Sequence, residues 1–175
     1  NDAGYSLLRL GGDACLQVDR IEDAVSYYTQ ALEAEPDSLS AASALAHALT
    51  ASGNYREALT YLKRTAVSGA KPEAYYDKAV CEINLGKLTD AEETLRILLD
   101  IDAEHQAGLL LLADVYERRG AFDEMLDTYA RYLELNTENM EVFRKASAVY
   151  RMRGENEAAL NGYEMILERN PADKI

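Results

Sequence analysis

The chain has 175 residues, of which 48% are hydrophobic, and it carries a formal net charge of −13. This length and apolar content suffice for a continuous hydrophobic core. So acidic a surface repels phosphate backbones and anionic lipids, which argues against nucleic acid and acidic membranes as partners. The charge is unevenly spread: residues 139–175 hold six Lys and Arg and six Asp and Glu, so all of the net charge lies in residues 1–138.

Neither the cysteines nor the apolar segments indicate an oxidised or membrane-inserted protein. Cys15 and Cys81 fall in separate helical patterns, so we expect both to be buried free thiols. The longest notable apolar run, Ala107–Ala113, is far below the roughly 18 residues of a membrane span. No signal-peptide pattern follows Asn1. We therefore expect a cytoplasmic protein without direct membrane insertion, cut from a longer chain; an exported or anchored parent chain stays open as an alternative.

The chain opens with a predicted pair of helices that turns at Asp19. The first helix contains Gly11 and Gly12, and each glycine in a helix interior costs about 1 kcal/mol relative to alanine. We therefore expect this helix to be the least stable of the chain. The second helix ends before Pro36, and Ser38 can cap the helix that follows.

The next two pairs turn at Gly53 and Gly86, because glycine adopts the left-handed conformation that ends a helix at little cost. The link between these two pairs, Ala66–Pro72, has lost one residue and contains Gly69. We expect a local change in superhelical pitch there.

The fourth pair shows the helical pattern most clearly. Apolar residues recur at steps of three and four in Leu109–Arg119 and in Phe122–Leu135, on either side of Gly120. Neither helix can bury its apolar stripe alone, so the pair must pack on itself and on neighbouring helices.

The fifth pair turns at Gly154, and no further helix follows it in this sequence. A stack of repeats needs a closing helix to cover its last apolar face. We therefore predict that Tyr163, Ile166 and Leu167 are uncovered, either because the native chain continues or because this end packs on another copy of the chain.

The five pairs repeat with a regular period. The turn residues Asp19, Gly53, Gly86, Gly120 and Gly154 are separated by steps of 34, 33, 34 and 34 residues. Small residues precede them by seven positions, at Gly12, Ala46, Ala79, Ala113 and Ser147. Five positions after them stand Ala24, Ala58, Ala91, Met125 and Ala159, and nine positions after them Tyr28, Leu62, Leu95, Tyr129 and Tyr163. The small residues let two antiparallel helices approach closely, and the large ones fill the space toward the next pair.

This pattern resembles that of tandem tetratricopeptide repeats, whose helix–turn–helix unit is about 34 residues long. The best match is Ile21–Pro36, with Ala24, Tyr28, Ala31 and Pro36 at the family's signature positions, although the chain lacks the family's Trp. The resemblance implies one all-α domain over residues 1–175, a right-handed superhelical solenoid of antiparallel helix pairs. Its repeats would cover residues 5–38, 39–71, 72–105, 106–139 and 140–173.

In this family the first helix of each repeat lines a concave groove, and the resemblance places the same positions in this sequence. The first three repeats contribute Arg9, Asp13, Gln17, Ser43, His47, Thr50, Glu73, Tyr76, Asp77, Val80 and Asn84. The last two contribute Leu110, Leu111, Asp114, Glu117, Arg118, Arg144, Lys145, Arg151 and Met152. The candidates for partner binding are Tyr76, Asp77, Val80, Leu110, Leu111, Asp114, Glu117, Arg144 and Arg151. An apolar and acidic middle with a basic end would complement a segment that has an apolar anchor, basic residues near it and an acidic end.

No arrangement of residues in the sequence indicates catalysis. There is no Walker-type loop, no HExxH and no CxxC motif. His47 and His105 fall in different repeats, and neither stands beside a cysteine or a paired carboxylate at ligand spacing. We therefore expect no enzymatic activity, no cofactor and no metal site.

The predicted function is a non-enzymatic scaffold that binds a peptide or helix of a partner protein in the groove around Tyr76–Asp114. The first alternative is a structural self-assembly module, a homo-oligomer formed through the C-terminal repeat as a dimer or a head-to-tail stack. The second alternative is the regulatory arm of an enzyme that lies outside this sequence. Loss of partner affinity on substitution of Tyr76 and Leu110 would favour the first function, and self-association at high concentration would favour the first alternative.

Overall fold

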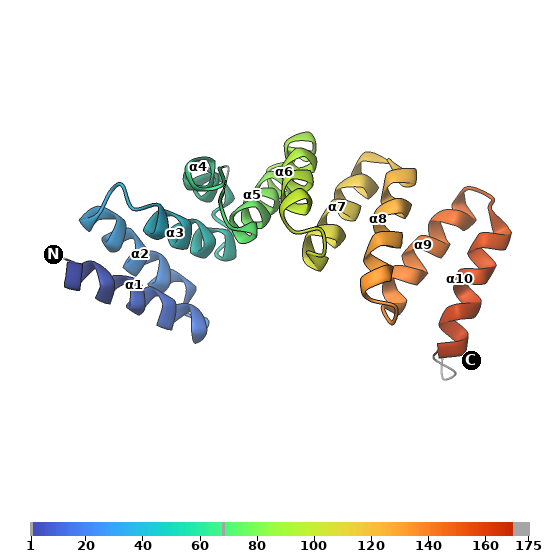
Figure 1. Cartoon of the computed structure of the whole chain (residues 1–175), viewed down its shortest axis with the longest axis horizontal. Helices are drawn as coiled ribbons and strands as arrows, with labels where there is room; N and C mark the ends of the chain where they lie inside the picture. The colour runs from blue at the N-terminus through green and yellow to red at the C-terminus, as the bar shows by residue number, and fades with distance from the viewer. Residues whose placement is uncertain (1, 68, 170–175) are drawn as a thin grey trace. The chain divides into compact units, whose positions relative to one another are not determined.

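The computed structural model describes residues 2–67 and 69–169, and these residues form α-helices joined by short turns (Figure 1). The helices are α1 (Asp2–Gln17), α2 (Ile21–Ala34), α3 (Leu39–Ala51), α4 (Tyr55–Thr65), α5 (Pro72–Asn84), α6 (Leu88–Ile101), α7 (Gln106–Arg119), α8 (Phe122–Leu135), α9 (Met140–Met152) and α10 (Asn156–Arg169). Each odd-numbered helix packs on the even-numbered helix that follows it. The chain is therefore an all-α helical-repeat solenoid, as the sequence predicts.

The helices fall into two compact units, residues 1–103 with α1 to α6 and residues 104–175 with α7 to α10. The division falls in the loop between the third and fourth helix pairs. The helices α3, α5, α7 and α9 begin at the residues predicted to open repeats two to five, which are Leu39, Pro72, Gln106 and Met140. In the part of the chain that the structure describes, no helix is both long enough and apolar enough to cross a membrane.

The predicted turn residues end the first helix of each pair in the left-handed conformation. Gly53, Gly86, Gly120 and Gly154 have φ angles of 79°, 73°, 69° and 77°. Asp19 takes this role in the first pair with φ of 58°, a conformation that strains a residue with a Cβ atom. Ser38 caps α3 as predicted, because its side chain accepts a hydrogen bond of 3.2 Å from the backbone N–H of Ala41.

The positions that repeat in the sequence are the positions that the fold buries. At the small-residue position of the second helix, Ala24, Ala58 and Ala91 are fully covered, and Met125 and Ala159 are 1% and 3% exposed. At the large-residue position, Tyr28, Leu62, Leu95 and Tyr129 are at most 3% exposed. The periodicity thus marks the hydrophobic core shared by neighbouring helices.

The two glycines of α1 lie where the tyrosines of α2 approach most closely. A Cβ atom on Gly12 would stand 2.4 Å from Cε1 of Tyr28, and one on Gly11 would stand 2.9 Å from Cδ1 of Tyr27. Tyr28 is 1% exposed, so its ring fills the space that the glycine leaves. The glycines lower the helix propensity of this segment, but their lack of a side chain makes room for the buried ring of Tyr28.

Helix α4 differs from the other second helices. It has 11 residues, whereas α2, α6, α8 and α10 each have 14. It ends at Thr65, and the link to α5 contains Gly69 with φ of 86°. The prediction that the link has lost a residue is therefore wrong: six residues join α4 to α5, against four in each of the other links between pairs, and the repeat is shorter because α4 is three residues shorter.

The prediction that Ile166 is uncovered is wrong, since this side chain is only 6% exposed. Ile166 stands twelve positions after its turn residue, and the same position is buried in every pair, at Ala31, Thr65, Leu98 and Tyr132. Helix α10 makes its contacts with α9, so Ile166 is covered within its own pair without a following repeat. Tyr163 and Leu167 are partly exposed.

Candidate functional site

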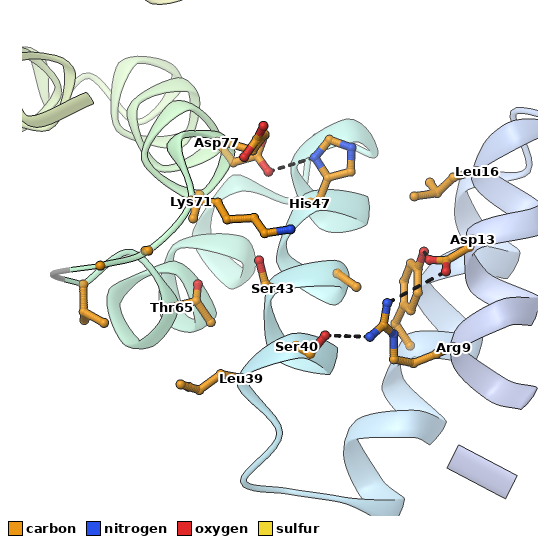
Figure 2. A pocket seen from close by; sticks show the side chains of 17 residues that line it. Arg9, Asp13, Leu16, Leu39, Ser40, Ser43, His47, Thr65, Lys71 and Asp77 are labelled. Carbon is orange, nitrogen blue, oxygen red and sulfur yellow. Dashed lines mark hydrogen bonds and ion pairs between the residues drawn. The ribbon is translucent and has the colours of Figure 1, made fainter. Parts of the chain in front are cut away.

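The first helices of the first unit surround a hollow of about 710 Å³, which we call the first-unit hollow (Figure 2). Helices α1, α3 and α5 form its sides, and residues between the end of α4 and the start of α5 complete it. Its lining includes six residues that the sequence predicts for a concave groove: Arg9, Asp13, Ser43, His47, Glu73 and Asp77. Within the first unit, the predicted groove positions therefore do come together.

On the α1 side of the hollow, Arg9 interacts with two polar side chains of the protein. Its Nη1 donates a hydrogen bond of 2.6 Å to Oγ of Ser40 on α3, and its Nη2 lies 3.9 Å from the carboxylate of Asp13. Asp13 also accepts a hydrogen bond of 2.6 Å from the hydroxyl of Tyr28. Burial, and then the bond to Asp13, raise the pKa of the Tyr28 phenol above its ordinary value. The positive charge of Arg9 is thus partnered within the protein.

The α3 and α5 sides are joined by His47 and Asp77. Nδ1 of His47 lies 2.8 Å from Oδ2 of Asp77, whose side chain is only 9% exposed (Figure 2). The hydrogen bond to Asp77 raises the pKa of His47, and partial burial opposes this rise. Sequence reasoning placed both residues in the groove but did not pair them. Their positions in the repeat could have suggested the pair. His47 stands six positions before Gly53 and Asp77 nine positions before Gly86, on the first helices of two adjacent repeats.

One cation of the hollow has no charge partner among the residues that the structure describes. Lys71, directly before α5, extends across the hollow toward α3 (Figure 2) and makes no ion pair with a residue that the structure describes. Glu73, two residues further on, is likewise outside every ion pair of the described chain. Leu39 and Val67 line the same hollow and are 53% and 47% exposed. The hollow therefore combines a fixed polar wall, an available ammonium group and exposed apolar side chains.

The other predicted candidates of the first unit, Tyr76 and Val80, are partly buried and do not line the first-unit hollow. In the second unit, Leu110, Leu111 and Asp114 are partly buried, while Glu117, Arg144 and Arg151 are exposed. Nε of Arg118 lies 2.9 Å from the Asp114 carboxylate, and Nη1 of Arg144 lies 2.6 Å from that of Glu141. A role of these residues in partner binding stays a prediction.

The second unit contains a smaller hollow of about 310 Å³ between α8, α9 and α10. Its lining is mainly aromatic and aliphatic, with Tyr129, Leu133 and Phe143 among the residues. Burial raises the pKa of Tyr129 to about 12. Sequence reasoning missed this hollow because its residues are packing residues, and the repeat pattern predicts that such residues are covered.

Neither hollow holds a constellation for redox or metal chemistry. Cys15 and Cys81 are buried free thiols, as predicted, and burial raises the pKa of the Cys81 thiol. Across residues 2–67 and 69–169, no group of three or more His, Cys, Asp or Glu side chains could hold a metal ion. The other histidine, His105, caps α7 by accepting a hydrogen bond of 2.9 Å from the backbone N–H of Gly108.

Comparison with known proteins identifies two matching family models and a related sequence. The family model described as anaphase-promoting complex, cyclosome, subunit 3 matches residues 17–98, and the tetratricopeptide repeat model matches residues 76–139. Sperm-associated antigen 1 of Rattus norvegicus is 27% identical over 121 residues, which cover 67% of this chain. The chain spans 14% of the length of that curated relative.

Several solved structures share the fold. A crystal structure of MamA superposes with a TM-score of 0.87 at 17% identity, covering 98% of this chain and 94% of that one. MamA from Desulfovibrio magneticus RS-1 gives 0.85 at 15% identity, with 98% of both chains covered. YrrB, described as a TPR protein with an unusual peptide-binding site, gives 0.78 at 18% identity, covering 94% of this chain and 85% of its own. With the repeat pattern, the helix pairs and the family models in agreement, the chain belongs to the tetratricopeptide-repeat proteins, a family whose fold serves as a scaffold for protein–protein interaction.

Proposed function

We propose that the chain is a non-enzymatic scaffold whose first unit binds a short segment of a partner protein in the first-unit hollow. The observation that carries this proposal is Lys71, a cation that extends into the hollow without an ion pair to any described residue. A volume of about 710 Å³ suits a segment of a few residues. The peptide-binding site named for the similar YrrB supports a peptide as the class of ligand.

The charges of the hollow indicate what the segment carries. Arg9 and His47 already lie against carboxylates of the protein, so neither is free to bind a second anion strongly. Lys71 is free to do so, and a carboxylate of the partner segment would form a charge-assisted hydrogen bond with it. Glu73 at the start of α5 would accept a basic residue of the same segment.

Affinity has to come mainly from apolar contact, because a partly exposed ion pair contributes only about 0.2–1 kcal/mol. Leu39 and Val67 are more than two-fifths exposed at the edge of the hollow. Burying an apolar side chain against them contributes about 1.5–3 kcal/mol. The proposed ligand is therefore a segment with an apolar residue next to an acidic one.

The half-buried pair Leu110 and Leu111 extends the proposal to the second unit. These leucines are not fully covered by the helices of that unit, and we propose that they contact an apolar side chain of a partner. Tyr76, Val80, Asp114, Glu117, Arg144 and Arg151 complete the set of proposed partner contacts outside the hollow.

A phage-displayed peptide library panned on the whole chain tests the proposal. We expect enriched peptides that carry an acidic residue beside an apolar one. The affinity of a synthetic copy, measured by fluorescence anisotropy, should fall several-fold, up to about tenfold, with Lys71→Glu, because the substitution replaces a weak attraction by a repulsion of similar size. Lys63→Glu is the matched control, since Lys63 is exposed in the last turn of α4 and does not line the hollow. Equal affinity of both variants would show that the peptide binds elsewhere.

A further inference from the structure

The smaller hollow of the second unit, which we call the second-unit hollow, lies where α9 packs on both α8 and α10 (Figure 1). Most of its walls are apolar side chains from these three helices, including Leu126, Leu133, Phe143, Ala146 and Met165. Ala130 of α8 and Asn161 of α10 also line it, and both are exposed. The hollow therefore opens to solvent between α8 and α10. Its volume of about 310 Å³ lies at the lower end of the range for ligand sites.

The hollow forms because the fifth pair has two small residues where every other pair has at least one large residue. The two positions stand eight residues before and eight residues after the turn residue. They hold Gly11 and Tyr27, Leu45 and Tyr61, Lys78 and Thr94, Leu112 and Thr128, and Ala146 and Gly162. In the third pair, Nζ of Lys78 crosses this space and donates a hydrogen bond of 2.9 Å to Oγ1 of Thr94. In the fifth pair, neither small residue can cross it, and both line the hollow.

The open space lies beside Ala146 rather than beside Gly162. A Cβ atom on Gly162 would collide with the hydroxyl of Ser147 on α9, so the two helices already meet there. Leu45 and Leu112, at the position of Ala146 in two other pairs, are 1% and 3% exposed. Ala146→Leu would therefore fill the hollow with a side chain that the repeat elsewhere buries.

Carboxylates border the mouth of the hollow on both sides. Residues three or four positions apart are neighbours on a helix surface. Five exposed acidic residues stand in this relation to Ala130, Asn161 or Met165 at the mouth: Asp127, Glu134, Glu157, Glu164 and Glu168. None of them makes an ion pair with a residue that the structure describes. Arg131 of α8 lies beside them and offsets one of these charges.

The basic residues of the fifth pair lie elsewhere. Arg144, Lys145 and Arg151 of α9 are exposed and do not line the second-unit hollow. The equal numbers of acidic and basic residues in 139–175 thus correspond to a separation of charge, with acids at the mouth of the hollow and bases on α9. A basic partner is attracted to the mouth, and an acidic one is repelled from it.

We infer that the second-unit hollow binds a basic amphipathic segment of a partner protein. An apolar side chain of the segment enters the hollow, and its Lys or Arg side chains lie against the carboxylates at the mouth. The acidic residues of α10 extend from Glu157 to Glu168, a distance of about 16 Å at 1.5 Å per residue. A ligand that fills the hollow and reaches these carboxylates must be extended, which favours a peptide segment over a small molecule. The charge preference is opposite to that proposed for the first-unit hollow, so the two units would select different segments.

Fluorescence anisotropy with the whole chain and a labelled synthetic peptide tests the inference. The probe is an amphipathic peptide of leucine and lysine, with its leucines at helical steps of three and four. It should bind, and the same peptide with glutamate in place of lysine should bind at least about tenfold more weakly. Ala146→Leu should weaken binding of the lysine peptide by about tenfold or more, because the apolar anchor loses its place. Ala148→Leu is the matched control on the same helix: Ala148 does not line the hollow, so the affinity should stay unchanged.

A second pair of variants tests the charges without disturbing the packing. Glu134→Lys combined with Glu164→Lys reverses one exposed carboxylate on each side of the mouth and should weaken binding several-fold. Glu22→Lys combined with Glu33→Lys is its control, because it changes the net charge equally at exposed positions of α2 in the first unit. At physiological ionic strength this control should have little effect, because salt screens distant charges.

Four results would overturn the inference. Wild-type affinity in Ala146→Leu would show that the peptide does not use the hollow, and a larger loss in Ala148→Leu would place the peptide on another face of α9. Equal binding of the lysine and glutamate peptides would mean that the hollow takes apolar ligands of any charge. Equal losses in the two charge-reversal variants would mean that net charge alone attracts the peptide. Urea denaturation checks that Ala146→Leu remains folded, and the charge variants decide the question if it does not.

Discussion

The substitution Gly12→Ala tests the packing of the first repeat most directly. On helix propensity alone, alanine should stabilise α1 by about 1 kcal/mol. The structure predicts the opposite sign, because the added Cβ would stand 2.4, 2.6 and 2.7 Å from three ring atoms of Tyr28. That ring is 1% exposed, and its hydroxyl is bound to Asp13 at 2.6 Å, so it cannot move away without losing packing and a hydrogen bond.

The magnitude follows from these opposing contributions. Overpacking a buried position costs about 1–3 kcal/mol, and a lost hydrogen bond costs about 1 kcal/mol more. After the gain in helix propensity, Gly12→Ala should lower the free energy of unfolding by about 1–3 kcal/mol. Gly11→Ala is the matched control. Its Cβ would meet Tyr27 at 2.9 Å, but this ring is 40% exposed and can turn toward solvent, so the variant should be as stable as the wild type or more stable.

Urea denaturation followed by circular dichroism measures both variants. A double variant, Gly12→Ala with Tyr28→Leu, should recover stability, because it recreates the Ala46 and Leu62 pairing of the second repeat. Gly12→Ala at or above wild-type stability would refute the reasoning, since the Tyr28 ring would then not fill the space beside this glycine.

Three further predictions concern single sites. Asp19→Gly should raise the free energy of unfolding by about 1 kcal/mol in the same denaturation assay, because a left-handed conformation costs a residue with a Cβ about 1–2 kcal/mol; no gain would mean that Asp19 makes compensating contacts. Leu112→Ala should lower it by about 2–5 kcal/mol, because Leu112 is 3% exposed, and a loss near zero would mean that the core face is misplaced. Asp77→Asn should lower the pKa of His47 in an NMR titration, because the Asp77 carboxylate raises it. The interaction of His47 with Asp77 should therefore stabilise the fold fully below pH 6.5, the approximate pKa of an unfolded histidine. This stabilisation should disappear as the pH rises through the raised pKa of His47 in the folded chain. A difference in stability between wild type and Asp77→Asn that does not change with pH would contradict this prediction.

The fold could be predicted from the sequence because the same packing constraint recurs in each repeat. A glycine or Asp19 at the turn, a small residue seven positions earlier and a large residue nine positions later fix how two helices meet. Ile166 shows where this reasoning fails: a count of apolar residues does not say which helix each one faces. The position of Ile166 relative to Gly154 would have predicted its burial, since the same register is buried in every pair.

The candidate site was predicted less completely, because it depends on contacts between repeats. The register identified the residues that point into the first-unit hollow, including Arg9, His47 and Asp77. It could not say that Arg9 binds Ser40 or that His47 binds Asp77, because these bonds depend on the rotation of neighbouring helices and on side-chain rotamers. Likewise, Lys71 lies outside the helical positions for which the family gives a rule.

The place of the hollow follows from the departure of the chain from its own period. Where the repeat step is 33 residues, α4 ends at Thr65, and the link that replaces its last turn brings Val67 and Lys71 to the edge of the hollow. Residues in the core registers are buried against other helices, so they are not available to contact a partner. An irregular link makes no helix–helix contacts of that kind, and this one carries an exposed valine and an ammonium group without an ion pair to any described residue. Under the proposed function, this link is therefore the part of the scaffold that selects the partner.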